Sequence, residues 1–383
     1  MAQKNILIVC GEASGDLNAA SLAKKILEIG PGIKIRAVGG TLLRQAGVEI
    51  FCDIKGLAVI GFFDALKKLP KFFTLQKTIL QEIKREKPDA IILVDFSGFN
   101  LRLARKINPS TTIKKTIPIL YYVSPQVWAS RSGRIKTIKK YIQKMIVLFK
   151  FEEDFYKRNG IAVDFIGHPL LDIVRPSIDK KDFLNKFRLA QSKTTVTLLP
   201  GSRKQEVENM LPLMLRTCLL ISKRLRNMQF VIAKSPQVDW DIYNRETYNL
   251  KIPVEIIEGQ TYDCLEAADF CLVCSGTATL ETAILGKPFV IIYKMNLLNY
   301  LLYRPQVKIP YIGMVNIVAK RKIIPEFIQY QAGPKKIADE VIKILQNPSR
   351  IWQVKKDLAE VKSLLGEKGA STRAARIVLD FLK

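Results

Sequence analysis

The chain has 383 residues, with 61 Lys+Arg against 35 Asp+Glu and a single His, so its formal net charge is +26. This length suggests two domains of about 100–200 residues each, and 48% apolar with 25% charged residues is typical of a globular protein. One His and six scattered Cys exclude a multi-His metal site, argue against a disulfide framework and indicate a reducing cytosol.

Short apolar strands alternate with helical patterns along the chain, which predicts an α/β doubly wound architecture with parallel sheets. We expect strands of a first sheet at Ile6–Cys10, Ile35–Val38, Ala90–Val94, Ile119–Val123 and Lys144–Leu148. The pattern then restarts, and we expect strands of a second sheet at Thr195–Leu199, Phe230–Ala233, Val254–Ile257, Phe270–Cys274 and Phe289–Tyr293.

This restart predicts two Rossmann-like domains joined near Gly167–Pro176, a segment with two prolines. We assign residues 1–168 to the first domain and residues 169–350 to the second. The remaining residues, 351–383, have a helical pattern broken by glycines. We expect these C-terminal helices to pack back on the first domain or on a partner.

Two loops at strand ends of the first domain carry candidate site residues. Gly11–Asp16 opens a helix, so its small residues let a ligand approach backbone N–H groups; alternatively it is a plain turn with Ser14 or Asp16 as helix N-cap. Asp95 directly follows the strand Ala90–Val94, where α/β sheets bind ligands. We interpret Asp95 as a candidate general base. A G-x-G-x-x-G pattern is absent, which argues against NAD.

Two loops of the second domain predict a phosphate-binding site. Leu198–Arg203 runs from a strand into a helix, where backbone N–H groups, the Ser202 hydroxyl and the Arg203 guanidinium converge. An Arg at this position opposes the helix dipole, which favours a bound anion. Ser275–Thr279 offers further hydroxyl and N–H groups, and Glu281 can accept hydrogen bonds from a vicinal diol such as ribose. Together these features are typical of a nucleotide-sugar site.

Two other patterns are interpreted as structural. Cys271 and Cys274 form a lone C-x-x-C inside a predicted buried strand, whereas a zinc site needs about four ligands. Asp239 and Asp241 match a metal-holding D-x-D pattern, but they lie in a polar loop. We therefore expect no metal.

The excess positive charge is concentrated between Ile60 and Lys150, which include 19 basic and 5 acidic residues, and it implies an anionic partner. One stretch mixes aromatic and basic side chains at Phe62, Phe63, Lys67, Lys68, Phe72 and Phe73. It fits a membrane surface, single-stranded nucleic acid, or a core with a solvated lysine face. No nucleic-acid-binding motif is recognisable. No apolar run reaches the about 18–20 residues that span a bilayer, so we expect a soluble protein that at most rests on a membrane.

Taken in order, the motifs resemble the lipid-A-disaccharide synthases, glycosyltransferases of the GT-B fold. The resemblance covers almost the whole chain and rests on Gly11–Asp16, Val94–Asn100, Tyr122–Trp128, Phe165–Pro169, Leu199–Arg203 with Glu206, Ser275–Glu281 and Asn316. The chain departs from the family pattern at Ser97 and Gly98, where Pro and an acidic residue are usual, and at Ser130, where a second Trp is common.

The resemblance implies two Rossmann-like domains whose parallel sheets face a central cleft, the first binding the acceptor and the second the UDP-sugar. It implies inverting transfer of 2,3-diacylglucosamine from its UDP derivative to 2,3-diacylglucosamine 1-phosphate, giving a β-1,6 linkage and UDP without metal or cofactor. It also implies a cytoplasmic enzyme on the anionic inner-membrane surface that binds no nucleic acid, and it leaves a homodimer open.

By motif, Asp95 is implied to be the base for the acceptor 6-hydroxyl, and Glu281 to bind the ribose. The implied diphosphate-binding residues are Gly201, Ser202, Arg203, Ser275, Gly276, Thr277, Ala278 and Thr279. The implied acceptor and cleft residues are Glu12, Ser14, Asn100, Gln126 and Asn316, with His168 either binding a ligand or stabilising the linker. The alternatives are another UDP-sugar enzyme of this fold, such as the peptidoglycan-lipid N-acetylglucosaminyltransferase, and a basic nucleic-acid-binding protein.

Overall fold

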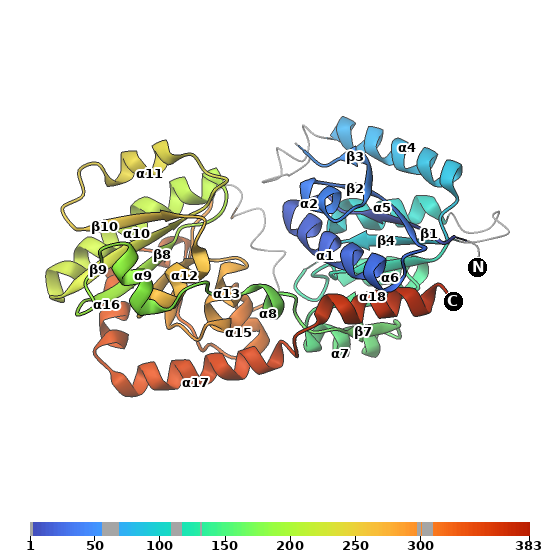
Figure 1. The fold of residues 1–383 in the computed structure, drawn as a ribbon. Coiled ribbons are helices and arrows are strands. Elements are labelled where there is room, and N and C mark those ends of the chain that lie inside the picture. Colours follow the sequence, from blue (N-terminus) through green and yellow to red (C-terminus); the bar gives the residue numbers. More distant parts are fainter. Residues whose placement is uncertain (1–2, 56–68, 109–116, 131, 297–299, 301–308) are drawn as a thin grey trace. The chain divides into compact units, whose positions relative to one another are not determined.

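Strands and helices alternate along the chain, and the strands form two parallel sheets (Figure 1). The computed structural model describes residues 3–55, 69–108, 117–130, 132–296, 300 and 309–383. These residues divide into two units: unit 1 contains those up to Pro169 together with Leu365–Lys383, and unit 2 contains those from Leu170 to Leu364. The predicted α/β architecture with parallel sheets is confirmed.

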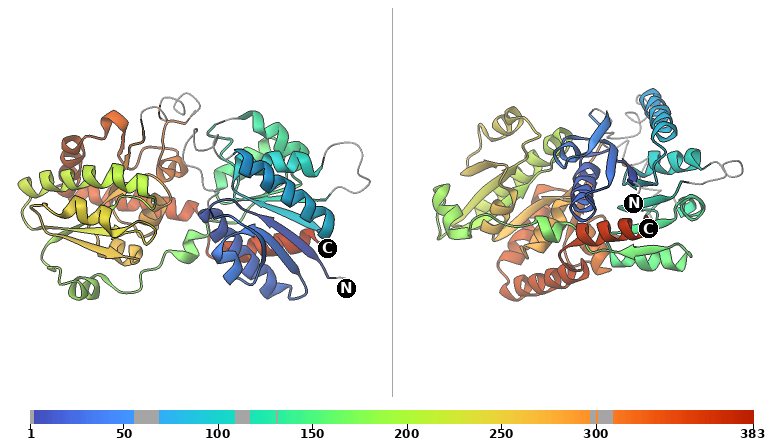
Figure 2. Two further views of the ribbon diagram at one scale, coloured as in Figure 1. Left: turned by 90° about the horizontal axis from the view of Figure 1, so that it is seen from above. Right: turned by 45° about the vertical axis from the view of Figure 1, so that its right-hand side comes forward.

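Unit 1 is built on a seven-stranded parallel sheet in the order β3-β2-β1-β4-β5-β6-β7. Its strands are β1 (Asn5–Val9), β2 (Lys34–Gly39), β3 (Glu49–Asp53), β4 (Ala90–Val94), β5 (Ile119–Tyr122), β6 (Lys144–Val147) and β7 (Val163–Phe165). Its helices are α1 (Ala13–Ile29), α2 (Thr41–Gln45), α4 (Leu69–Glu86), α5 (Ser97–Ile107), η1 (Ser132–Arg134), α6 (Ile135–Tyr141), α7 (Lys150–Arg158) and α18 (Ala370–Phe381). The central strand β4 is buried along its whole length because helices cover both faces of the sheet (Figure 2).

Unit 2 is built on a six-stranded parallel sheet in the order β10-β9-β8-β11-β12-β13. Its strands are β8 (Thr194–Leu199), β9 (Met228–Lys234), β10 (Val254–Glu258), β11 (Phe270–Cys274), β12 (Phe289–Tyr293) and β13 (Glu326–Ile328). Its helices are α8 (Leu170–Ile173), α9 (Lys180–Lys186), α10 (Lys204–Arg224), α11 (Trp240–Thr247), α12 (Thr261–Ala267), α13 (Ala278–Ile284), α15 (Met314–Ala319), η3 (Gln329–Gln331), α16 (Pro334–Leu345) and α17 (Pro348–Leu364). Met214 of α10, Phe230 of β9 and Val341 of α16 belong to its core.

All ten strands expected from the sequence are present. Three further strands, β3, β7 and β13, lie at sheet edges. β7 and β13 have only three residues each, and none of the three strands is fully buried. Acidic residues interrupt or flank the apolar residues in all three, so these positions carry no long apolar run.

The two C-terminal helices belong to different units. α17 packs on α13, α15 and α16 of unit 2, so the expectation that all of residues 351–383 pack on the first domain or on a partner is wrong for α17. α18 packs on α1 in unit 1. Gly366 and Gly369, with φ of 86° and 90°, turn the chain between the two helices.

No described helix is long and apolar enough to cross a membrane. Among the residues that the structure describes, no group of three or more His, Cys, Asp or Glu is arranged to hold a metal ion. Cys271 and Cys274 are buried free thiols in β11, and Asp239 is the residue that precedes α11.

Candidate active site

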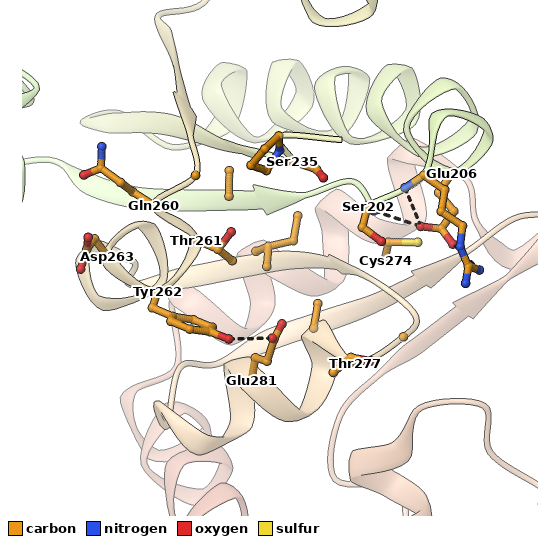
Figure 3. A pocket seen from close by; sticks show the side chains of 18 of the residues that line it. Ser202, Glu206, Ser235, Gln260, Thr261, Tyr262, Asp263, Cys274, Thr277 and Glu281 are labelled. Carbon is orange, nitrogen blue, oxygen red and sulfur yellow. Dashed lines mark hydrogen bonds and ion pairs between the residues drawn. The ribbon is translucent and has the colours of Figure 1, made fainter. Parts of the chain in front are cut away.

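The carboxyl ends of β8 to β12 surround a pocket of about 830 Å³ in unit 2 (Figure 3). In parallel sheets the loops at this edge are the ones that bind ligands. The expected diphosphate and ribose residues that line the pocket are Gly201, Ser202, Arg203, Ser275, Gly276, Thr277, Ala278 and Glu281. The fold thus gathers around one cavity two motifs that are far apart in the sequence.

The first of these motifs is the turn from β8 into α10. Gly201 has a φ of +126°, and a Cβ there would lie 2.6 Å from the Cβ of Glu206, so only glycine fits. Arg203 is the N-cap residue of α10. The backbone N–H groups of Ser202 and Arg203 donate to Oε2 of Glu206, at 3.0 and 3.3 Å. The turn therefore gathers hydrogen-bond donors suited to an anion.

The second motif is the turn from β11 into α13. A Cβ on Gly276 would have no neighbour within 4 Å, so the backbone borders open space. Thr279 is buried, and its Oγ1 donates to the carbonyl of Gly276 at 2.8 Å. The expectation that the Thr279 side chain binds the diphosphate is therefore wrong: this hydroxyl stabilises the turn.

Glu281 of α13 lies opposite Tyr262 of α12, whose hydroxyl donates to Oε1 of Glu281 at 3.0 Å (Figure 3). Burial raises the pKa of Glu281, and the hydrogen bond from Tyr262 lowers it. Burial and the charge of Glu281 raise the pKa of Tyr262, so its hydroxyl stays protonated and donates. Sequence reasoning missed Tyr262, because a single Tyr in a short helix forms no recognisable pattern.

Replacing Tyr262 by Phe should weaken the binding of both uridine and UDP by about 3–10-fold, since it removes one hydrogen bond that orients Glu281. Calorimetric titration of both ligands measures the effect. Tyr248→Phe, which alters an exposed tyrosine outside the pocket, is the matched control. Wild-type affinity for both ligands in Tyr262→Phe would show that Tyr262 does not position Glu281 for the ribose.

Asp95 follows β4 in unit 1, at the carboxyl edge of the sheet. Its N–H donates to the carbonyl of Tyr122 at 3.0 Å, and its own carbonyl accepts a hydrogen bond from the Tyr121 hydroxyl. Burial and the negative charge of Glu12 raise the pKa of Asp95 to about 6. At pH 7 such a carboxylate is mostly ionised yet more basic than an ordinary Asp, which suits a general base.

The backbone around Asp95 is strained. Asp95, Phe96 and Val123 have φ values of 48°, 46° and 61°, in the left-handed region that non-glycine residues rarely adopt. A Cβ on Gly11 would lie 2.3 Å from the Phe96 ring, so the loop after β1 passes directly against the loop after β4. Strain of this kind concentrates at functional sites.

The Asn100 side chain holds the backbone of Asp95 by hydrogen bonds. Its side chain is fully buried, and Nδ2 donates to the carbonyls of Asp95 at 2.9 Å and Val94 at 3.2 Å. The expectation that the Asn100 side chain lines a cleft is therefore wrong. It is a positioning residue for the end of β4.

The residues after β1 differ in their surroundings, and only some of them are accessible to a ligand. Glu12 is the N-cap residue of α1 without a capping side-chain bond, and Ser14 is exposed in the first turn. Asp16 is buried and accepts the N–H groups of Gly40 at 2.7 Å and Leu42 at 3.0 Å. Asp16 therefore caps α2 and not its own helix, and Glu12 and Ser14 stay candidates for ligand contact.

Gln126 is exposed in the segment after β5. This segment is held by Glu152, whose Oε1 accepts hydrogen bonds from Ser124 Oγ at 2.7 Å and Trp128 Nε1 at 3.0 Å. Burial raises the pKa of Glu152 to about 7, and these hydrogen bonds lower it. Sequence reasoning missed Glu152, since it reaches the loop from α7.

His168 lies at the end of unit 1, and its ring centroid is 5.1 Å from that of Phe149. The backbone N–H of His168 donates to the carbonyl of Leu365 at 2.8 Å, and Leu365 is the residue at which the chain returns to unit 1. Burial lowers the pKa of His168 to about 4, so the ring is neutral at pH 7. The backbone contact fits the linker role, and ligand binding stays a hypothesis.

Asn316 of α15 does not line the pocket of unit 2. Its side chain is fully buried: Oδ1 accepts the N–H groups of Ile323 and Ile324, both at 2.9 Å, and Nδ2 donates to Glu326 Oε1 at 2.8 Å. The expectation that the Asn316 side chain is a cleft residue is therefore wrong. It stabilises the segment that leads into β13.

Four of the six expected membrane residues, Phe62, Phe63, Lys67 and Lys68, lie outside the described residues. The other two, Phe72 and Phe73, differ in environment. The Phe72 ring centroid lies 5.8 Å from that of Phe96 and 6.1 Å from that of Phe99, so Phe72 is partly buried against the core of unit 1, which favours the core interpretation for this residue. Phe73 is 66% exposed.

The two parallel sheets, with a pocket at the carboxyl edge of the second, define the GT-B class of fold. Solved structures with this fold include UDP-GlcNAc 2-epimerase from Neisseria meningitidis bound to UDP-GlcNAc (TM-score 0.62, 12% identity, 99% of each chain covered) and Acinetobacter baumannii MurG (TM-score 0.56, 14% identity, 99% of each chain covered). The chain belongs to the lipid-A-disaccharide synthetase family, whose model matches residues 6–381.

Relatives named lipid-A-disaccharide synthase match over nearly their full length. The protein from Syntrophus aciditrophicus (strain SB) is 41% identical, with 100% of this chain and 99% of the relative covered. The protein from Geobacter sulfurreducens is 38% identical, with 98% and 97% covered. These relatives confirm the resemblance seen in the motifs, and the family is one of glycosyltransferase enzymes.

Proposed function

We propose that this protein transfers 2,3-diacylglucosamine from its UDP derivative to the 6-hydroxyl of 2,3-diacylglucosamine 1-phosphate, with inversion at the anomeric carbon and release of UDP. Inverting transfer by direct displacement needs a base for the acceptor and a stabilised leaving group. Each unit supplies residues suited to one of these tasks.

In unit 1 the base is Asp95. Its carboxylate accepts the proton of the acceptor 6-hydroxyl as the oxygen forms its bond to the anomeric carbon. The raised pKa of about 6 gives the carboxylate affinity for this proton, and the hydrogen bonds around it fix its backbone. The negative charge of Glu12 contributes to this raised pKa of Asp95.

In unit 2 the leaving UDP is held by the two turns that line the pocket. The guanidinium of Arg203, with N–H and hydroxyl groups of both turns, neutralises the charge that develops on the diphosphate when the glycosidic bond breaks. Glu281, oriented by Tyr262, accepts hydrogen bonds from the ribose hydroxyls.

The observation that carries the proposal is the pocket of unit 2, which brings donors for a diphosphate and a carboxylate for a diol around one cavity. The test is a coupled assay for UDP release with the two diacylated sugars. We expect release only when both are present. Release with an undecaprenyl-linked acceptor instead would favour a peptidoglycan-lipid transferase of the same fold.

We also propose that the reaction needs no metal or organic cofactor, because Arg203 and the N–H groups of the turns can balance the diphosphate charge. Full activity in the presence of EDTA is expected.

The nucleic-acid alternative is tested separately, by measuring RNA binding. Salt-sensitive RNA binding at moderate ionic strength would favour that alternative over the proposed reaction.

Both substrates carry acyl chains, and each buried methylene contributes about 0.8 kcal/mol, so both remain in the bilayer. A protein acting on them must reach the membrane surface, and we propose that it does so at the anionic cytoplasmic face of the inner membrane. Phe73 and the lysines Lys77 and Lys84, which border one shallow hollow on α4, offer a described part of such a surface.

Changing Phe62 and Phe63 to Ser and Lys67 and Lys68 to Gln should reduce sedimentation with anionic liposomes several-fold, since it removes both apolar insertion and charge attraction. The matched control changes two exposed aromatics and two exposed lysines of unit 2, Tyr330, Trp352, Lys355 and Lys356, in the same way. Equal sedimentation of both variants and wild type would refute the surface.

A further inference from the structure

We propose that the Glu206 carboxylate competes with the donor's diphosphate for the same hydrogen-bond donors, and so limits how tightly unit 2 holds UDP. The inference rests on the proposed function, because it concerns the same pocket. It assigns a role to Glu206, which takes no part in the reaction as proposed above.

The geometry places an anion where a phosphate is expected (Figure 3). Oε2 of Glu206 accepts the N–H groups of Ser202 at 3.0 Å and Arg203 at 3.3 Å. Oε1 lies 3.5 Å from a guanidinium nitrogen of Arg203. These are the N–H groups and the guanidinium expected to bind the diphosphate.

This arrangement is more than an ordinary helix cap. A Glu at the third helical position commonly accepts the N–H of the N-cap residue alone. Here Glu206 also takes the N–H of Ser202, because the φ of +126° at Gly201 folds the turn over the Glu206 side chain. Glu206 lines the pocket and is partly exposed, so a ligand can displace its carboxylate.

The donor's diphosphate and the Glu206 carboxylate cannot both accept hydrogen bonds from the same N–H groups. The two groups are also both negatively charged, so they repel each other when they lie in the same pocket. The charge of Glu206 acts within the pocket: burial and this charge raise the pKa of the Cys274 thiol, which also lines the pocket, to about 12. UDP therefore binds only by displacing Glu206 or against its repulsion. After transfer, the returning carboxylate helps to expel the product.

The test compares the binding of UDP and uridine to wild type, Glu206→Gln and Glu208→Gln by calorimetry. Gln keeps an acceptor oxygen for the turn but removes the charge, so we expect UDP to bind Glu206→Gln about 10-fold tighter. Uridine has no phosphate and should bind equally. Glu208 lies on the same helix but outside the pocket, so Glu208→Gln should match wild type for both ligands.

Unchanged or weaker UDP binding in Glu206→Gln would overturn the inference and leave Glu206 as a cap that shapes the turn. An equal gain in Glu208→Gln would also overturn it, since the effect would then come from net charge. If Glu206→Gln does not fold, Glu206→Asp, which retracts the carboxylate by one methylene, should give a smaller gain in the same direction; no gain would overturn the inference. Wild type that binds neither uridine nor UDP would refute the proposed function instead.

Discussion

Replacing Asp95 by Asn should reduce turnover by about 10²–10⁴-fold, the usual contribution of a general base. Asn has the same shape but does not accept the acceptor proton. It also tolerates the left-handed backbone at this position, where φ is 48°. Binding of UDP, which involves unit 2, and the melting temperature should stay close to wild type.

The pH profile gives a second measure of this role. Because the pKa of Asp95 is raised to about 6, kcat/KM should rise with pH through about 6 and then level off, as the carboxylate becomes ionised. Glu12→Gln removes a charge that raises this pKa, so the rising limb should shift to lower pH. The limb should vanish in Asp95→Asn.

Asp154→Asn, which removes an exposed carboxylate from unit 1, is the matched control and should have wild-type kinetics. Wild-type turnover in Asp95→Asn would exclude Asp95 as the base. A rising limb that persists near pH 6 in this variant would assign the titrating group elsewhere.

Replacing Arg203 by Ala should weaken UDP binding by about 10–100-fold, because hydrogen bonds to a charged partner contribute about 1.5–3 kcal/mol. Uridine lacks the diphosphate and should bind almost as before. Arg203→Lys keeps the charge but loses the planar fork, so we expect an intermediate loss. Calorimetric titration separates the three variants.

Arg216→Ala, an exposed position on the same helix and outside the pocket, controls for the loss of one positive charge. The same loss of UDP affinity in Arg216→Ala would point to general electrostatic attraction. Equal weakening of uridine in Arg203→Ala would mean that the pocket itself is distorted.

The sequence predicted best where the chain has strong local patterns. Strands such as β4 and β11 are runs of five buried apolar residues, and Asp95 and Ser275 follow these two runs directly. Because every parallel strand presents its carboxyl end at the same edge, order along the chain was enough to gather these residues at the ligand-binding edge of each sheet.

The errors come from polar side chains whose partners are set by tertiary contacts. Thr279 and Asn316 belong to motifs with ligand-binding character, yet the chain's own carbonyls, N–H groups and carboxylates use their hydrogen bonds. Tyr262 and Glu152 were missed for the converse reason, since each reaches its partner from another helix. The spacing of residues along the chain therefore predicts neither which polar side chains the fold itself uses nor which distant side chains reach the site.

Packing of α18 on α1 makes the first unit depend on two helices that are separated in the sequence by the whole of unit 2. During synthesis on the ribosome, α1 is made before unit 2 and α18 after it. In the nascent chain α1 therefore stays uncovered by α18 until unit 2 has been made. A premature stop codon just before α18 would remove a helix of unit 1.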